Sequence, residues 1–153
     1  MLGYMKVYAE NKRARFDYEI LEAFEAGISL TGHEAKSVRS GRINMTGSHA
    51  IVRDGEVFAI GLDVPSFQPN NVPPDHNENR SKKLLLKRRE VKYLAGKLQD
   101  GLTLVPIKLY SEGAFLKLEL ALARGKKKRD KREVIKKRET DRDIQRALRK
   151  QWE

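Results

Sequence analysis

Leucines recur at every second position of the stretch F115-L-K-L-E-L-A-L-A123. Successive side chains of a β-strand point to opposite faces of the sheet, so these leucines fall on one face. This period of two predicts a half-buried strand over residues 115–123. The rest of the fold must supply neighbouring strands for this segment and a hydrophobic core that covers its leucine face.

Further strands are expected upstream. Residues 50–60, AIVRDGEVFAI, predict a hairpin, because Asp54 and Gly55 tolerate the positive φ angles of a tight turn between two apolar runs. FDYEILEAF at 16–24 is typical of a strand. LTLVPIKLY at 102–110 predicts another, with an edge or a bulge at Pro106, since proline has no N–H to donate to a ladder.

Two helices are expected between these strands. Thr31 and Glu34 have the spacing of a capping box, which predicts a short helix to about Arg39, ended by Gly41. The pattern of leucines and lysines over 81–98 predicts an amphipathic helix with a basic outer surface. Three prolines and four asparagines make residues 66–79 an exposed loop.

These elements predict an α+β chain that is mainly β. Five or six antiparallel strands with two inserted helices favour a small closed barrel, since closure removes exposed strand edges. We prefer the oligonucleotide/oligosaccharide-binding (OB) type, although the number of strands does not separate it from other small barrels.

Positive charge is concentrated at the end of the chain. Residues 124–153 hold 14 basic and 6 acidic residues, a net charge of +8, out of +11 for the whole chain. We therefore divide the chain into a barrel domain, 1–123, and a basic tail, 124–153, disordered when free because it cannot bury enough apolar surface. Such a tail favours a polyanion, first nucleic acid and second an anionic membrane, with mere solubilisation as the alternative.

The composition limits the chemistry. The absence of cysteine excludes disulfides and thiolate chemistry and fits a reducing cytosol, and we find neither a signal peptide nor a membrane span. His33, His49 and His76 lack the spacing of a metal site, and the phosphate-loop, dinucleotide and nucleophile-elbow motifs are missing. We therefore expect a cytoplasmic protein that is not an enzyme and that binds no metal or cofactor.

RNA binding has more support from the residues. Basic side chains cluster at 11–15, 35–39 and 79–83, which is joined by 87–89. Polar neighbours such as Asn11 and Glu34 can hydrogen-bond to base edges or 2′-hydroxyls, which cationic contacts to phosphate do not discriminate. Each cluster taken singly is better explained as a solvated surface.

Five stretches together resemble one family, small protein B, the SsrA-binding protein that binds transfer-messenger RNA (tmRNA). The similar stretches, in the order of the family, are N11-K-R-A-R-F-D-Y-E-I-L21, G27-I-S-L-T-G-H-E-A-K-S-V-R-S-G41, N79-R-S-K-K-L-L-L86, G101-L-T-L-V-P-I-K-L-Y110 and G125-K-K-K-R-D-K-R132. The resemblance implies a six-stranded antiparallel OB-like barrel with inserted helices and a disordered basic C-terminal tail.

The resemblance also implies a function, that of a non-catalytic adaptor. Family members bind the tRNA-like domain of tmRNA and, with elongation factor Tu and GTP, enter stalled ribosomes for trans-translation, in which the nascent chain is tagged for proteolysis. The tail lies in the empty decoding site and mRNA channel of the small subunit, where it becomes helical. We expect the protein itself to be a monomer.

The residues that we expect in these roles combine the family motifs with the basic clusters around them. The predicted RNA-binding residues are Asn11, Lys12, Arg13, Arg15, Gly32, Glu34, Lys36, Ser37, Arg39, Arg80, Lys82 and Lys83. The predicted tail residues are Gly125, Lys126, Lys127, Asp130, Lys131, Arg132, Ile135, Lys136 and Arg138. The sequence departs from the usual family pattern at Ala35, Lys87 and Arg129.

Glu34 is given two roles in this interpretation. Its carboxylate caps the helix and keeps a spare oxygen that accepts a hydrogen bond from the RNA. Glu34→Gln is then expected to weaken RNA binding more than folding. The alternative functions are a general OB-type ribosome- or RNA-binding assembly or rescue factor and, third, a metal-dependent nuclease.

Overall fold

Seven strands form one antiparallel sheet in the computed structural model, which describes residues 5–68, 70–74, 76–126 and 128–152, with the backbone alone for 128–134 and 148–152. The strands are β1 (Met5–Glu10), β2 (Tyr18–Ile28), β3 (His49–Arg53), β4 (Glu56–Ile60), β5 (Lys82–Leu85), β6 (Thr103–Glu112) and β7 (Phe115–Gly125). The helices are α1 (Lys12–Asp17), α2 (Gly32–Arg39), α3 (Arg88–Gln99) and α4 (Lys128–Trp152).

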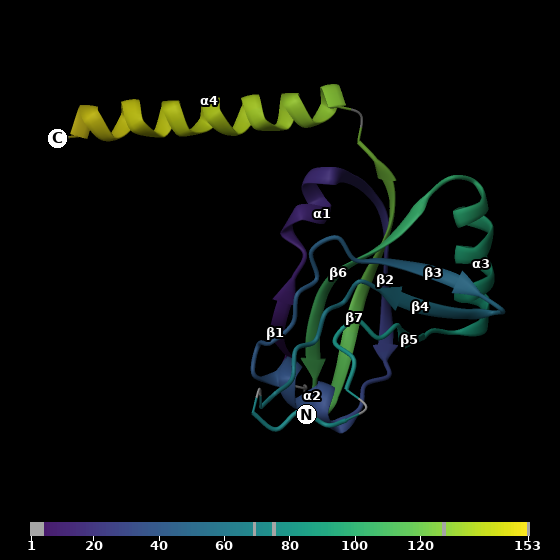
Figure 1. The fold of residues 1–153 in the computed structure, drawn as a ribbon. Helices are drawn as coiled ribbons and strands as arrows, with labels where there is room; N and C mark the ends of the chain where they lie inside the picture. Colours follow the sequence, from purple (N-terminus) through teal and green to yellow (C-terminus); the bar gives the residue numbers. More distant parts are fainter. Residues whose placement is uncertain (1–4, 69, 75, 127, 153) are drawn as a thin grey trace.

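The strand pairings return to their starting point. The order is β1-β6-β3-β4-β5-β2-β7, and β7 also pairs with β6, so six strands make a closed circuit with β1 attached to β6 (Figure 1). The combination of helices with a mainly antiparallel sheet agrees with the predicted α+β class. The sheet has seven strands rather than six. The additional strand, β1, was not predicted because it is largely exposed and shows little apolar alternation in the sequence. The OB-like classification stays a prediction.

Strand β7 and the hairpin confirm two predictions. Leu118, Leu120 and Leu122 are at most 1% exposed and belong to the main core. Alternate residues of the same strand are buried on its other face, where Ala121 and Ala123 pack with Ala14 of α1. The β3–β4 turn has positive φ angles at its two central residues, as expected.

Pro106 lies beside the predicted bulge. The β6–β7 register shifts between Pro106 and Lys108. The chain there turns carbonyl groups toward Asn11, whose Nδ2 donates to Pro106 O at 3.0 Å and whose backbone N–H donates to Ile107 O at 2.7 Å. The bulge therefore anchors the start of α1, a helix that the sequence analysis missed by placing residues 16 and 17 in the following strand.

The helix expected over 81–98 begins later. Lys82–Leu85 is strand β5, which pairs with both β4 and β2, and α3 starts at Arg88. Burial alternates along β5, with Lys82 and Leu84 inside and Lys83 and Leu85 outside. Two neighbouring strands satisfy the backbone hydrogen bonds of this segment, and that tertiary pairing outweighs its helical pattern.

The tail differs from the expectation of disorder. α4 is helical over 25 residues, about 37 Å at 1.5 Å per residue. Its many Lys, Arg and Glu residues have high helix propensity, and residues 135–147 are exposed, so propensity rather than packing accounts for the helix in that part. Figure 1 shows α4 leading away from the sheet. The domain boundary and the ordering of the tail on the ribosome stay predictions.

Within the described residues, no helix combines the length and the apolar character required to cross a membrane.

Candidate nucleic-acid interface

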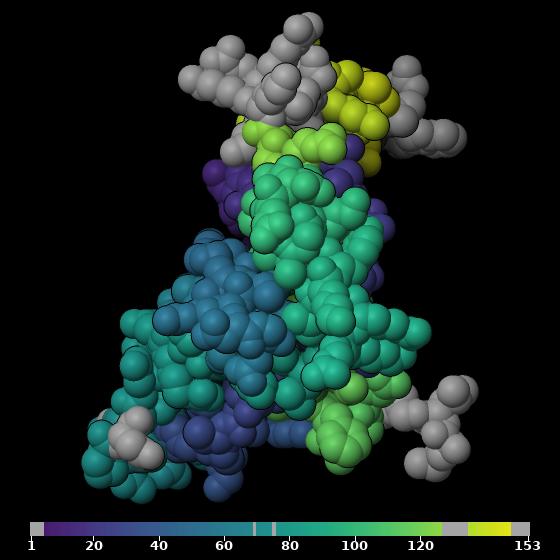
Figure 2. Space-filling model, turned by 90° about the vertical axis from the view of Figure 1, so that its right-hand side faces the viewer, coloured from purple at the N-terminus to yellow at the C-terminus, as the bar shows by residue number. Residues whose placement is uncertain are grey.

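The predicted RNA-binding residues lie in two groups. Residues 11–15 are in and before α1, beside the start of the tail, whereas Gly32–Arg39 of α2 lies at the opposite end of the sheet (Figure 1). Figure 2 shows the 66–80 loop, in teal, beside α2 at the end away from the tail. The structure therefore brings the 79–83 cluster to α2 and separates both from α1.

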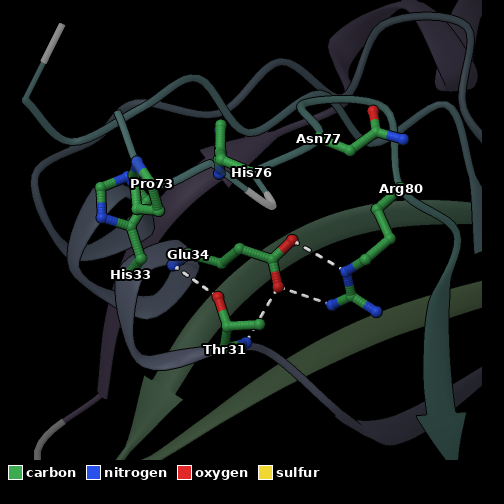
Figure 3. A pocket seen from close by; sticks show the side chains of 7 residues that line it. All are labelled: Thr31, His33, Glu34, Pro73, His76, Asn77 and Arg80. Carbon is green, nitrogen blue, oxygen red and sulfur yellow. Dashed lines mark hydrogen bonds and ion pairs between the residues drawn. The ribbon is translucent and has the colours of Figure 1, made fainter. Parts of the chain in front are cut away.

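Glu34 is the centre of the α2 group (Figure 3). Thr31 N–H donates to Glu34 Oε1 at 2.9 Å, and Glu34 N–H donates to Thr31 Oγ1 at 3.1 Å, which confirms the capping box. Arg80 clamps the same carboxylate, with Nε donating to Oε2 at 3.2 Å and Nη2 donating to Oε1. Both carboxylate oxygens of Glu34 accept hydrogen bonds within the protein, and the residue is 2% exposed. The prediction that one oxygen is spare is therefore wrong.

Arg80 is also largely committed to the protein. Besides the carboxylate of Glu34, its guanidinium donates to Ser81 O at 3.2 Å and to Ser29 O at 3.3 Å. A guanidinium has five N–H donors, and these four bonds use most of them. Arg80 therefore fixes the 66–80 loop against α2 more than it offers a free fork to a phosphate.

Lys82 is fully buried beneath this pair. Its Nζ donates to Leu62 O and to Arg80 O, both at 2.7 Å, and lies 4.0 Å from Glu34 Oε2. Burial lowers the pKa of Lys82, and the nearby Glu34 carboxylate opposes part of that shift. The ammonium has no exposed surface from which to contact RNA, so its role here is to hold the chain at residues 62 and 80.

The pKa of Glu34 lies below its ordinary value. Burial acts to raise it, but the hydrogen bonds from Arg80 and Thr31 and the charges of Arg80 and Lys82 together outweigh burial. A depressed pKa in the folded state means that the ionised carboxylate stabilises the fold above its unfolded-state pKa.

This shift predicts an acid sensitivity centred on Glu34. Its stabilisation should be complete above the ordinary value of 4.5 and should be lost as the pH falls through the lower folded-state pKa. Urea unfolding from about pH 6 to about pH 3 measures it, and the wild-type free energy should fall more steeply than that of Glu34→Gln, which cannot titrate. Parallel pH profiles would contradict the assignment.

Two of the other predicted residues, Asn11 and Ser37, are buried. Asn11 is 4% exposed, and its Oδ1 accepts from Ala14 N–H at 3.3 Å, capping α1. Ser37 is completely buried in α2. Gly32, the first residue of α2, has open space where a Cβ would lie. These residues shape the surface, and the side chains of Asn11 and Ser37 lie beneath it.

The exposed cations among the predicted RNA-binding residues are Lys12, Arg13, Arg15, Lys36, Arg39 and Lys83. Three of them have partners within the protein: Arg13 pairs with Asp17 at 3.2 Å, Lys83 pairs with Glu56 at 3.0 Å, and Arg39 donates to Ala114 O at 3.0 Å. In the described part of the chain, Lys12, Arg15 and Lys36 have no ion-pair partner. Lys36 is the one among these three that lies in α2.

Two adjoining cavities separate α2 from the 66–80 loop, and we call them together the α2 groove. The inner cavity, about 220 Å³, is lined by Thr31, His33, Glu34, Pro73, His76, Asn77 and Arg80 (Figure 3). The outer cavity, about 310 Å³, is lined by His33, Lys36, Phe67, Gln68, Asn71, Val72, Pro73 and Pro74. His33 and Pro73 line both.

Most of the loop residues in this groove have no role predicted from the sequence. His33 and His76 lack the spacing of a metal site, yet their rings meet edge to face, with centroids 5.0 Å apart at 76°. Their separation in sequence hides the contact. The clustering of proline and asparagine predicted the loop itself but did not predict that the loop packs against α2.

The tail begins at the α1 end. Gly125 is the last residue of β7 and pairs with Tyr18. Lys126 N–H donates to Asp17 O at 2.9 Å and its Nζ to Arg15 O at 3.2 Å. Lys127 lies outside the described residues. All the other predicted tail residues lie in α4. The backbone of Asp130, Lys131 and Arg132 is helical, and Ile135, Lys136 and Arg138 are exposed.

Among the residues that the structure describes, His, Cys, Asp and Glu side chains form no group of three or more that could hold a metal ion.

Comparison with known proteins gives one consistent result. Residues 8–150 match the family described as SmpB protein. The chain is 46% identical over 151 residues to the SsrA-binding protein of Gloeothece citriformis, covering 98% of this chain and 97% of the relative. It is 49% identical over 146 residues to the SsrA-binding protein of Gloeobacter violaceus, covering 95% of each.

A solved structure gives the same relationship. It is described as "tmRNA-SmpB: a journey to the center of the bacterial ribosome", and its matching chain superposes with a TM-score of 0.65 at 44% identity, covering 83% of this chain and 93% of that one. Since both the family match and the curated relatives span nearly the whole sequence, the chain belongs to the SmpB protein family.

Proposed function

We propose that this protein binds tmRNA through its tRNA-like domain and delivers it to stalled ribosomes in trans-translation. The observation that carries the proposal is the nearly full-length similarity to SsrA-binding proteins. The likeness to a solved tmRNA-SmpB structure supports both RNA and ribosome as partners. In this role the protein is a non-catalytic adaptor without a cofactor, and the peptidyl transfer belongs to the ribosome.

We assign RNA binding to the α2 groove. Lys36 supplies an exposed cation without a carboxylate partner. The Glu34–Arg80–Lys82 cluster, in which Glu34 and Lys82 are buried and Arg80 is partly exposed, carries one negative and two positive charges. Its net positive charge favours a polyanion over the groove. Imidazole, amide and proline side chains line the walls, and such groups contact unpaired bases more readily than they contact a regular helix.

The tail has a separate role in this proposal. α4 is strongly basic and starts at the end opposite the groove, so tmRNA bound at α2 leaves it accessible. We assign it to the vacant decoding site and mRNA channel of the small subunit. Elongation factor Tu with GTP joins through tmRNA, and the protein acts as a cytoplasmic monomer.

A binding measurement tests the proposal against a generic RNA-binding role. The purified protein should bind the tRNA-like domain in preference to an elongator tRNA and to duplex RNA of equal mass. The preference should survive when salt rises from about 50 to about 200 mM, because shaped polar contacts release few counterions. Indifferent binding that disappears with salt would leave only a general OB-type RNA-binding factor.

A further inference from the structure

We propose that the inner cavity of the α2 groove holds one unpaired nucleobase of the bound RNA, and that His76, His33 and Asn77 contact it. This inference rests on the proposed function and deepens it, because it names the part of the RNA that the protein reads. The cavity, the orientation of the two imidazoles and an unpaired polar atom carry the argument.

The size of the cavity suits a single ring system. Its volume of about 220 Å³ lies below the ~300–1,000 Å³ of sites for drug-sized ligands. Figure 3 shows His33 and Pro73 on one side of Glu34, with Asn77 and Arg80 on the other. A double helix cannot enter such a space, whereas a base that has left its stack can.

The position of His33 is fixed before RNA arrives. Phe67 N–H donates to its Nε2 at 3.2 Å, and Ser66 Oγ lies 3.1 Å from the same nitrogen. The ring of His76 meets it edge to face, so the two imidazoles present a preformed aromatic wall. Histidine is one of the side chains on which unpaired RNA bases stack, and a wall already held in place loses little conformational entropy on binding.

One polar atom near the cavity still needs a partner. His76 Nε2 is inaccessible to solvent and has no hydrogen-bond partner among the described residues. Leaving such a buried group unpaired is unfavourable, because it has lost its water without gaining a hydrogen bond. The edge of a base carries both donors and acceptors, so it can pair with Nε2 in either tautomer once the His76 ring turns toward the cavity, and the exposed Asn77 on the cavity lining offers a direct contact through its amide.

The charges around the cavity fit a nucleotide. Glu34 is neutralised by Arg80 and lies near the Lys82 ammonium, so the cavity floor does not repel a phosphate. Lys36 lines the outer cavity, which shares His33 and Pro73 with the inner one. When a base occupies the inner cavity, the phosphate backbone of its nucleotide therefore lies toward the Lys36 ammonium.

The first test changes the RNA and leaves the protein intact. Each unpaired position of the tRNA-like domain is made abasic in turn, and binding to the full-length protein is measured. We expect one position at which removal of the base weakens binding about tenfold, since stacking and edge contacts are lost together. If every abasic RNA binds within about twofold of the parent, no base enters the cavity and the inference is wrong.

The second test connects that position to the cavity. 2-Aminopurine at the sensitive position should lose fluorescence on binding the wild-type protein, because stacking quenches it, and should lose much less on binding His76→Ala. His49→Ala is the matched control, since His49 is an exposed imidazole on β3 outside the groove. Equal quenching by His76→Ala and His49→Ala would overturn the assignment.

The outcomes separate this inference from the proposed function. Selective binding of the tRNA-like domain with no sensitive base would remove the nucleobase site and keep the adaptor function. Loss of selectivity in the wild-type protein would remove the adaptor function itself. Urea unfolding of His76→Ala checks its fold, and the abasic RNA series remains decisive if that variant is unstable.

Discussion

Glu34→Ala should lower the free energy of unfolding by about 3 kcal/mol and disrupt the α2 groove with it. The substitution removes the capping box of α2 and leaves Arg80 and Lys82 without their carboxylate. Removing one partner of a buried ion pair costs ~3–5 kcal/mol, and we expect the lower end because the Arg80 side chain is 39% exposed.

Urea unfolding followed by circular dichroism measures this loss, and binding of the tRNA-like domain is measured alongside. Glu19→Ala is the control, since Glu19 is an exposed carboxylate on β2, and it should change stability by less than about 0.5 kcal/mol. Because Arg80 and Lys82 also lose their anionic partner in Glu34→Gln, we expect this variant to lose stability as well, whereas the sequence alone predicts a larger effect on RNA binding. A Glu34→Ala protein of wild-type stability that fails to bind RNA would mean that Glu34 touches the RNA directly.

A chain ending at Lys126 should bind the tRNA-like domain with nearly wild-type selectivity and should fail to support tagging. Because β7 continues to Gly125 and Lys126 bonds to α1, this endpoint keeps the sheet whole. An endpoint at Ala123, the boundary expected from the sequence, removes the pairings of Gly125 with Tyr18 and of Arg124 with Glu19.

Tagging is measured in reconstituted translation of an mRNA without a stop codon. A full-length chain in which the order of residues 128–152 is scrambled keeps the charge and serves as the control. Loss of tagging with the scrambled tail means that side-chain order matters, and full tagging means that charge suffices. Tagging by the shortened chain would contradict the role assigned to α4.

Local patterns predicted the parts of the fold that local physics determines. The leucine alternation of β7, the Asp54–Gly55 turn and the Thr31–Glu34 box depend on neighbours within a few residues, and all three are present. β5 was mistaken for the start of a helix because its hydrogen-bond partners lie in β4 and β2.

The candidate site was harder to predict for the same reason. Glu34 was singled out correctly as a cap, but Arg80, which occupies both its oxygens, lies 46 residues further along the chain. Lysine is seldom fully buried unless it is paired, so we expected Lys82 at the surface, whereas it is completely buried. The groove itself arises from the meeting of His33 with a loop more than thirty residues away.

Strand β7 physically links the two ends of the molecule. Next to its first residue, Ala114 O accepts a hydrogen bond from Arg39 of α2, and beyond its last residue Lys126 is bonded to the chain around α1. Eleven residues of extended chain span about 37 Å. In the proposed function, the length of β7 therefore sets the distance between RNA bound at the α2 groove and the start of the tail, and the ribosome must offer its two sites at that spacing.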